Sequence, residues 1–279
     1  MRSHILNEIE QLDAVLDHER IVYLTSCFEF PFDMTRALEF ALFRTYCVPS
    51  ISALLAHTGE FEARPQKRYD DTDIIVSELL EHGYSSERGT RAIMRMNQLH
   101  GRFKIANDDF KYVLSTFVFE PIRWIDRFGW RRLSETERLA MFRFWREVGM
   151  RMKIADLPED YQEFEGFNRA YERARFSYKE TNRRIGTATV ELFASWYPRI
   201  VAPLVRRSIY ALLDEPVRSA FGFPEASPVL RRLVPWALKA RGRVAGWFPT
   251  RGAPRLRSDL TRPTYPSGYT IEDLGPPGG

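Results

Sequence analysis

The sequence predicts an all-α fold, and three observations indicate it. Apolar residues recur at intervals of three and four along most of the chain, which is the spacing of one face of a helix. No two alternating runs are joined by the tight Asn-Gly or Asp-Gly turn of a β-hairpin. The 279 residues are 44% hydrophobic, which is enough to bury a sizeable core. We therefore expect a single multi-helix domain over residues 1–248.

The predicted helices begin and end at residues with known capping preferences. Asp33 is expected to cap a helix over residues 33–47, because a short polar side chain accepts hydrogen bonds from free helix amides. Gly83 is expected to end the next helix, over residues 71–83, since glycine tolerates the left-handed conformation there. Further helices are predicted over 86–100, from Asn107 with a kink at Pro121, from Ser134 with Glu137 completing a capping box, and near Pro158, Lys179, Pro198 and Pro228.

Positive charge is concentrated toward the C-terminus. Residues 199–262 contain thirteen Lys or Arg against four Asp or Glu, a difference of +9, whereas the whole chain carries +4. Within this stretch, residues 227–248 combine Leu, Val and Trp with Arg and Lys. That composition suits either a helix lying on an anionic membrane face or a solvated basic helix that packs on the domain. A nucleic-acid partner is not expected, because no recognition motif accompanies the charge.

The last segment, residues 249–279, differs in composition from the rest. It is rich in Pro and Gly and has few large apolar side chains. Such a segment cannot build a core of its own. We expect a flexible C-terminal tail or an arm laid over the domain.

The cysteines and the N-terminus favour a cytoplasmic location. Cys27 and Cys47 are too few for a disulfide framework, and both lie in apolar helical patterns where a reduced buried thiol is common. The first residues include acids where a signal peptide needs an apolar run. Secretion is therefore not expected.

Several familiar catalytic motifs are absent from the sequence. It contains no P-loop, no G-x-G-x-x-G, no G-x-S-x-G, no H-E-x-x-H and no C-x-x-C, and the histidines other than His100 show no paired ligand spacing. Nucleotide binding, serine hydrolysis and the common zinc sites therefore have no signature here.

His100 is the candidate ligand-binding residue. It lies at the edge of an apolar stripe formed by Ala92, Ile93, Met96, Leu99 and Phe103. One interpretation is a buried histidine bonded to a backbone carbonyl at the helix end. The other is a metal ligand beside Gly101, which would let a flat apolar cofactor approach the backbone. If His100 holds iron, it does so alone from the protein side, the arrangement of a five-coordinate haem.

Three stretches resemble the MpaB oxygenase family, which includes the rubber oxygenases. They are FEFPFDMTRALEFALFRTYCVPSISALLAHTGEF, RPQKRYDDTDIIVSELLEHG and RAIMRMNQLHGRFKIANDDFKYVLSTFVFEPIRWIDRFGW, and the similarity covers roughly residues 20 to 245. The resemblance implies an all-α domain that encloses a pocket for haem b, with His100 matching the histidine that ligates the iron.

The resemblance also implies residues on the opposite side of the haem. Arg68 and Thr72 match the arginine and threonine of the family's distal motif, and Asp71 stands where the rubber oxygenases have a lysine. Glu60 and Glu62 are the candidates for a carboxylate base.

The residues themselves leave alternatives open at this motif. Arg68 would pair with a haem propionate or with Asp70, Asp71 or a surface glutamate, and Thr72 would be a pocket hydroxyl or a first-turn cap.

These features together lead to an expected activity. We expect a haem b-dependent oxygenase, an oxidoreductase that uses O2 on an apolar isoprenoid or lipid-like substrate, with oxidative cleavage of a carbon–carbon double bond implied by the resemblance. The alternative is a non-catalytic helical protein that binds haem or lipid. Peripheral contact with a membrane would run through the basic C-terminal helix.

Overall fold

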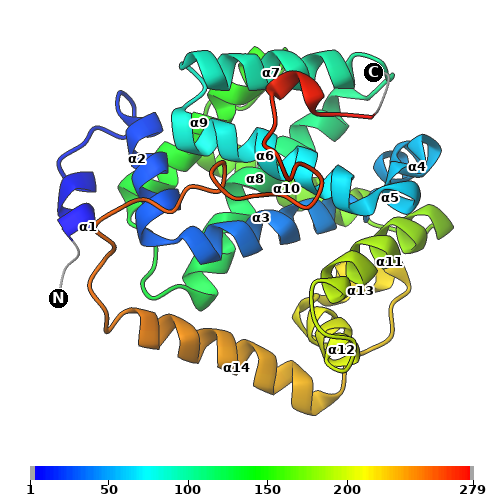
Figure 1. Cartoon of the computed structure of the whole chain (residues 1–279). Coiled ribbons are helices and arrows are strands. Elements are labelled where there is room, and N and C mark those ends of the chain that lie inside the picture. Colours follow the sequence, from blue (N-terminus) through cyan, green and yellow to red (C-terminus); the bar gives the residue numbers. More distant parts are fainter. Residues whose placement is uncertain (1–3, 277–279) are drawn as a thin grey trace.

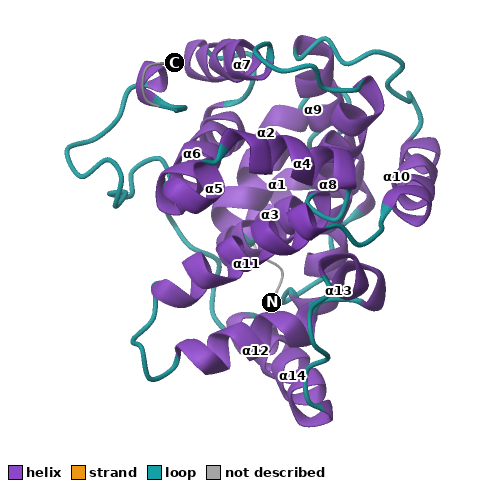
Figure 2. Ribbon diagram, turned by 90° about the vertical axis from the view of Figure 1, so that its right-hand side faces the viewer, coloured by secondary structure: helices purple, strands orange, loops and turns teal. Residues whose placement is uncertain are grey.

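The computed structural model describes residues 4–276, and every regular element in that range is a helix, which confirms the all-α prediction (Figures 1 and 2). The elements are α1 (His4–Ile9), α2 (His18–Leu24), the π-helix η1 (Thr25–Glu29), α3 (Pro31–Thr45), α4 (Pro49–Thr58), α5 (Glu60–Ala63), α6 (Pro65–His82), α7 (Glu87–His100), α8 (Asn107–Phe128), α9 (Glu135–Arg151), α10 (Tyr161–Arg175), α11 (Glu180–Ser195), α12 (Ala202–Leu212), α13 (Glu215–Phe221), α14 (Pro228–Ala245) and the 3₁₀ turn η2 (Ile271–Asp273).

Several helix ends form where capping chemistry predicts them. The Ser86 hydroxyl accepts a hydrogen bond from the Gly89 amide at the start of α7. Ser134 and Glu137 make both bonds of the capping box that opens α9. Gly83 follows α6 with a φ of 78°, a conformation that L side chains rarely adopt. The predicted ends at these residues are confirmed.

Two predicted helix starts were wrong because a proline supplies the first turn instead. Helix α3 begins at Pro31, so Asp33 lies inside the first turn and caps nothing. Its carboxylate instead accepts hydrogen bonds from the Trp124 indole at 3.3 Å and from Arg241 at 2.6 Å. Helix α6 begins at Pro65 rather than at residue 71. Proline fixes φ near its helical value and has no amide to leave unpaired.

The core is built around α8, which packs along α3 and also contacts α9, α10 and α14. Figure 2 shows α3 and α8 in the middle of the helical layers. Fully buried aromatic side chains on and around α8 include Tyr112, Phe119, Phe142, Phe144 and Phe164. Burying each ring contributes roughly 2 to 3 kcal/mol. Cys27 and Cys47 are free and buried, as expected.

The C-terminal segment, residues 249–276, lies over the helices. In Figure 1 it runs from the end of α14 past α3 and α6 and ends beside α7. Leu274 is fully buried in the core of the domain, and Ile271 is nearly so. Of the two alternatives for this segment, the described part is an arm on the domain; residues 277–279 of the predicted tail lie outside the described residues.

No single helix between residues 4 and 276 is long and apolar enough to cross a bilayer. Helices α3 and α4 meet that test of length and composition only together, as a pair bent by 98°.

Candidate functional site

The site forms where the start of α6 meets the end of α7. These consecutive helices are joined by the short turn at residues 83–86 and pack against each other. A hairpin of this kind brings the first turns of one helix beside the last turn of the next. Arg68 is consequently close enough to His100 for its charge to influence the imidazole.

His100 is the last residue of α7, and its Nδ1 atom is buried without a hydrogen-bond partner. This overturns the interpretation of a histidine bonded to a backbone carbonyl. Burial, with the Arg68 charge adding to it, lowers the pKa of His100 from 6.5 to about 4. The ring is therefore neutral at pH 7. A neutral imidazole with a free nitrogen is the form that ligates metals.

Arg68 has no ion pair within residues 4–276, so the alternative of a salt bridge to Asp70, Asp71 or a surface glutamate is wrong. Its guanidinium donates to the Thr72 hydroxyl one turn later. Thr72 in turn donates to the Arg68 carbonyl at 3.1 Å. Because α6 begins at Pro65, Thr72 lies inside the helix and is not a first-turn cap. The pair shares one face of α6.

Aromatic rings lie against both Arg68 and His100. The Arg68 guanidinium lies 5.3 Å from the centroid of the Phe61 ring, which meets Tyr46 edge to face at 5.3 Å. Burial raises the pKa of Tyr46 to about 12, and the Arg68 charge opposes the rise. Phe110 meets the His100 ring edge to face, with the ring centroids 5.3 Å apart. Tyr46 and Phe61 were not predicted, although Phe61 lies only seven residues before Arg68 in the sequence.

Three other candidate side chains have partners outside this cluster. Glu60 pairs with Arg64 one turn later on the chain, and Glu62 pairs with Arg184 of α11. The Asp71 carboxylate accepts hydrogen bonds from Lys67 at 3.0 Å and from the Gly275 amide at 3.1 Å. Asp71 therefore belongs to the contact between α6 and the C-terminal arm.

The predicted inward stripe of α7 ends earlier than expected. Phe103 is exposed, because α7 stops at His100 and the chain turns before reaching it. Ala92 and Ile93 are buried as predicted.

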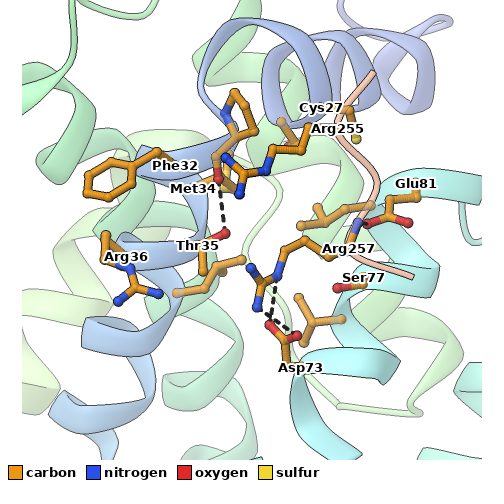
Figure 3. Close-up of a pocket in the computed structure, with 15 residues that line it drawn as sticks. Cys27, Phe32, Met34, Thr35, Arg36, Asp73, Ser77, Glu81, Arg255 and Arg257 are labelled. Atoms are coloured by element: carbon orange, nitrogen blue, oxygen red, sulfur yellow. Dashed lines mark hydrogen bonds and ion pairs between the residues drawn. The ribbon is translucent and has the colours of Figure 1, made fainter. Parts of the chain in front are cut away.

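A separate cavity of about 110 Å³, lined by both polar and apolar side chains, lies between α3, the second half of α6 and the C-terminal arm (Figure 3). Arg257 enters it from the arm and donates to Asp73 at 3.0 and 2.8 Å. The Ser26 hydroxyl is buried there without a hydrogen-bond partner. The cavity has room for several water molecules. His100, Arg68 and Thr72 do not line it, so it is distinct from the site.

The residues of the site fit a metal that brings most of its own ligands. No group of three or more His, Cys, Asp or Glu side chains in the described part of the chain is arranged to hold a metal ion. His100 alone offers a neutral nitrogen, and Arg68 offers a cation with no carboxylate partner. Haem meets both conditions, because the porphyrin supplies four nitrogens and its propionates attract arginine.

The fold and the site define an all-helical protein in which a buried, unpaired histidine nitrogen lies at the end of α7, and the comparisons specify its family. A family model described as the catalytic domain of ER-bound oxygenase mpaB/B′ and rubber oxygenase matches residues 37–247. The chain belongs to this family, an oxidoreductase family of oxygenases, which confirms the resemblance seen in the sequence.

Two fungal relatives show the extent of the similarity. ER-bound oxygenase mpaB′ of Penicillium brevicompactum is 31% identical over 72% of this chain and 52% of its own length. ER-bound oxygenase mpaB of Penicillium roqueforti is 30% identical over 77% of this chain and 79% of its own length. The chain thus spans about half of the first relative.

Proposed function

We propose that this protein is a haem b-dependent oxygenase that acts on an apolar, isoprenoid or lipid-like substrate, with His100 as the iron ligand. The observation that carries the proposal is the His100 Nδ1 atom, buried and without a hydrogen bond beside an arginine without a carboxylate. Family membership supports the oxygenase class. Bound haem would supply the iron chemistry that activation of O2 requires.

The protein's own residues would hold and shield this cofactor. His100 would ligate the iron as a neutral imidazole. Arg68, held in place by Thr72, would bind an anionic propionate or polarise an oxygen atom of the reactants. Phe61, Tyr46 and Phe110 would exclude water, which strengthens the electrostatic effect of Arg68.

A groove next to Phe61 gives an apolar substrate a place to approach. It lies between the start of α6 and α11, has a volume of about 570 Å³, and is lined by Phe61, Pro65, Ala188 and Leu192 among others. Glu60 remains the proposed carboxylate base. For that role its ion pair with Arg64 must open.

We propose a cytoplasmic location with peripheral contact to a membrane, since apolar substrates partition into lipid. The relatives named ER-bound support a membrane contact in general. Small-molecule substrate and O2 would be the partners, with no nucleic acid.

The test is an absorption spectrum of the protein expressed with a haem precursor. Wild type and His57→Ala, a matched control at an exposed histidine of α4, are expected to show a Soret band. His100→Ala is expected to lose or shift the band. Absence of haem from all three folded proteins, even after reconstitution, would overturn the proposal.

A second measurement separates an oxygenase from a haem or lipid carrier. Oxygen uptake that depends on an added terpenoid alkene is expected of the oxygenase. Haem binding without any such uptake would favour the carrier.

A further inference from the structure

Helix α14 presents an apolar stripe to solvent. Val229, Leu233, Trp236, Ala240 and Val244 follow one another at intervals of four, three, four and four residues, which places them on one helix face. Trp247 lies just beyond the helix end, and its side chain is 80% exposed; Val229 is 70% and Trp236 63% exposed. Two exposed tryptophans, Trp236 on the stripe and Trp247 just past its end, are unusual for a surface that contacts only water.

The opposite side of α14 is fixed to the domain, so the stripe cannot simply turn inward. Arg241 forms a 2.6 Å ion pair with the buried Asp33. Gly242 is buried so closely against α8 that a Cβ atom there would lie 2.3 Å from the Phe128 carbonyl oxygen. Leu238 packs against the core. The helix therefore has one apolar side in the domain and another facing out.

Unpaired cations follow one edge of the stripe. Arg232, Lys239 and Arg243 lie 7 and 4 residues apart, on neighbouring positions of one helix face. Within the described chain, none of the three has an ion-pair partner. Residues 226–248 contain no Asp or Glu at all.

We propose that this face of α14 docks on an anionic membrane surface, with the tryptophans in the headgroup region and the basic edge against lipid phosphates or carboxylates. Apolar residues beside a basic edge are the features of a helix that lies in a membrane interface. A second copy of the chain fits less well, because pairing two such faces would bring basic edges together without counter-charges. The inference deepens the membrane part of the proposed function and does not depend on haem.

The same geometry predicts the orientation of the docked protein. In both views of the molecule α14 lies at the bottom and α7 at the top (Figures 1 and 2). Docking through α14 therefore holds α7 on the side away from the bilayer. The contact would anchor the enzyme near its lipid source, while substrate reaches the groove at α11 from the side.

Sedimentation of the full chain with lipid vesicles tests the proposal. We expect binding to phosphatidylcholine vesicles that contain about 30% phosphatidylserine, little binding to phosphatidylcholine alone, and weakening by salt. The double variant Trp236→Ser/Trp247→Ser and the double variant Arg232→Glu/Lys239→Glu should each bind at least about tenfold more weakly. Met94→Ser on α7 and Arg173→Glu on α10, both at exposed positions, are the matched controls and should bind as wild type does.

Site-specific labels test the orientation. Both native cysteines are buried, so a fluorophore can be attached at Leu233→Cys or Met94→Cys. Lipids with a quencher should quench the label at residue 233 and not the label at residue 94. Failure of the wild-type chain to bind either vesicle would overturn the proposal, and a dimer abolished by the tryptophan changes would assign the face to a second copy. Neither result would alter the haem spectrum, so the two proposals fail separately.

Discussion

At the scale of single residues, His100 is placed at a cost to folding. A buried nitrogen without a hydrogen bond loses its hydration and gains nothing in return, a penalty of about 1–3 kcal/mol. Most buried polar atoms avoid it: Asn168, for example, donates to Ser115 and accepts from Arg123, both at 2.9 Å. A residue retained for the stability of the core would be expected to behave like Asn168. The unpaired state of His100 instead suits a residue reserved for a ligand.

This contrast predicts opposite effects of two leucine substitutions on the ligand-free protein. His100→Leu removes an unsatisfied polar atom, so we expect the free energy of unfolding to stay the same or to rise by about 1 kcal/mol. Asn168→Leu removes two buried side-chain hydrogen bonds, those with Ser115 and Arg123, so we expect the free energy of unfolding to fall by about 2 kcal/mol. Urea unfolding followed by circular dichroism measures both values. A loss above 1 kcal/mol in His100→Leu would identify a structural role for the imidazole.

A second residue-scale prediction concerns Glu39, a buried acid of α3. Burial raises the pKa of Glu39 to about 7, although Arg36 and Tyr69 both donate to its Oε1 at 2.7 Å and oppose the rise. Between pH 4.5 and 7 the folded protein therefore holds a proton that the unfolded chain has released. The contribution of Glu39 to the free energy of unfolding is therefore fully present below pH 4.5. It is lost as the pH rises to about 7.

Glu39→Gln removes this titration while keeping an oxygen that accepts both hydrogen bonds. Between pH 4.5 and pH 8, the free energy of unfolding of wild type should fall by on the order of 3 kcal/mol relative to that of this variant. Urea unfolding at several pH values measures the difference, with Glu163→Gln at an exposed position of α10 as the control that should follow wild type. A difference between wild type and Glu39→Gln that stays constant with pH would contradict the assigned pKa.

At the scale of elements, α6 is held from outside by the C-terminal arm. Acidic side chains from Asp70 to Glu81 of α6 accept hydrogen bonds from residues of the arm. The pairs are Asp70 with the Thr264 amide at 3.1 Å, Asp71 with the Gly275 amide at 3.1 Å, Asp73 with Arg257 at 2.8 Å, Glu78 with Tyr269 at 2.6 Å and Glu81 with the Arg257 amide at 2.6 Å. The helix that carries Arg68 and Thr72 is thereby fixed.

The arm also contributes to the hydrophobic core, and one side chain tests how much. Leu274 is fully buried, so Leu274→Ala should lower the free energy of unfolding by about 2–4 kcal/mol through the cavity it leaves. Leu260→Ala, at a position of the arm that is 40% exposed, should cost less than about 0.5 kcal/mol. Thermal unfolding of the two variants provides the comparison. If both variants lowered the free energy of unfolding equally and only slightly, the arm would be detached from the domain in solution.

Helix ends that depend on local capping residues were predictable from the sequence. Contacts between segments far apart in the sequence were not. The hydrogen bonds of Ser86, Ser134 and Glu137 span three residues, so local chemistry determines them. The arm is different, because Tyr269 meets Glu78 across 191 positions of the chain. Its Pro and Gly content indicates a lack of secondary structure and carries no information about what it packs against.

At the scale of the whole molecule, the candidate site on α6 and α7 and the proposed membrane face on α14 lie on different sides of one helical domain (Figure 1). The sequence indicated three members of the site, since Arg68, Thr72 and His100 matched a family pattern, and their closeness follows from the pairing of the consecutive helices α6 and α7. It did not indicate Tyr46, which reaches Phe61 from the end of α3. It also did not show that Asp71 faces the arm, because Gly275 of the arm, which donates to Asp71, lies 204 residues away along the chain.

The proposed ligand should change the order of stability among whole proteins. Without haem, His100→Leu is expected to unfold at the same temperature as wild type or above it. If haem binds only the folded wild type, through His100, it raises the free energy of unfolding by RT ln(1 + [L]/Kd). This is about 2.7 kcal/mol when the free haem concentration is a hundred times Kd. Wild type should then become the more stable protein, while the variant gains little. His57→Leu, at an exposed histidine, should follow wild type throughout a hemin titration monitored by thermal unfolding. An equal rise in all three proteins would mean that haem binds elsewhere, and the unpaired imidazole would then need another ligand to explain it.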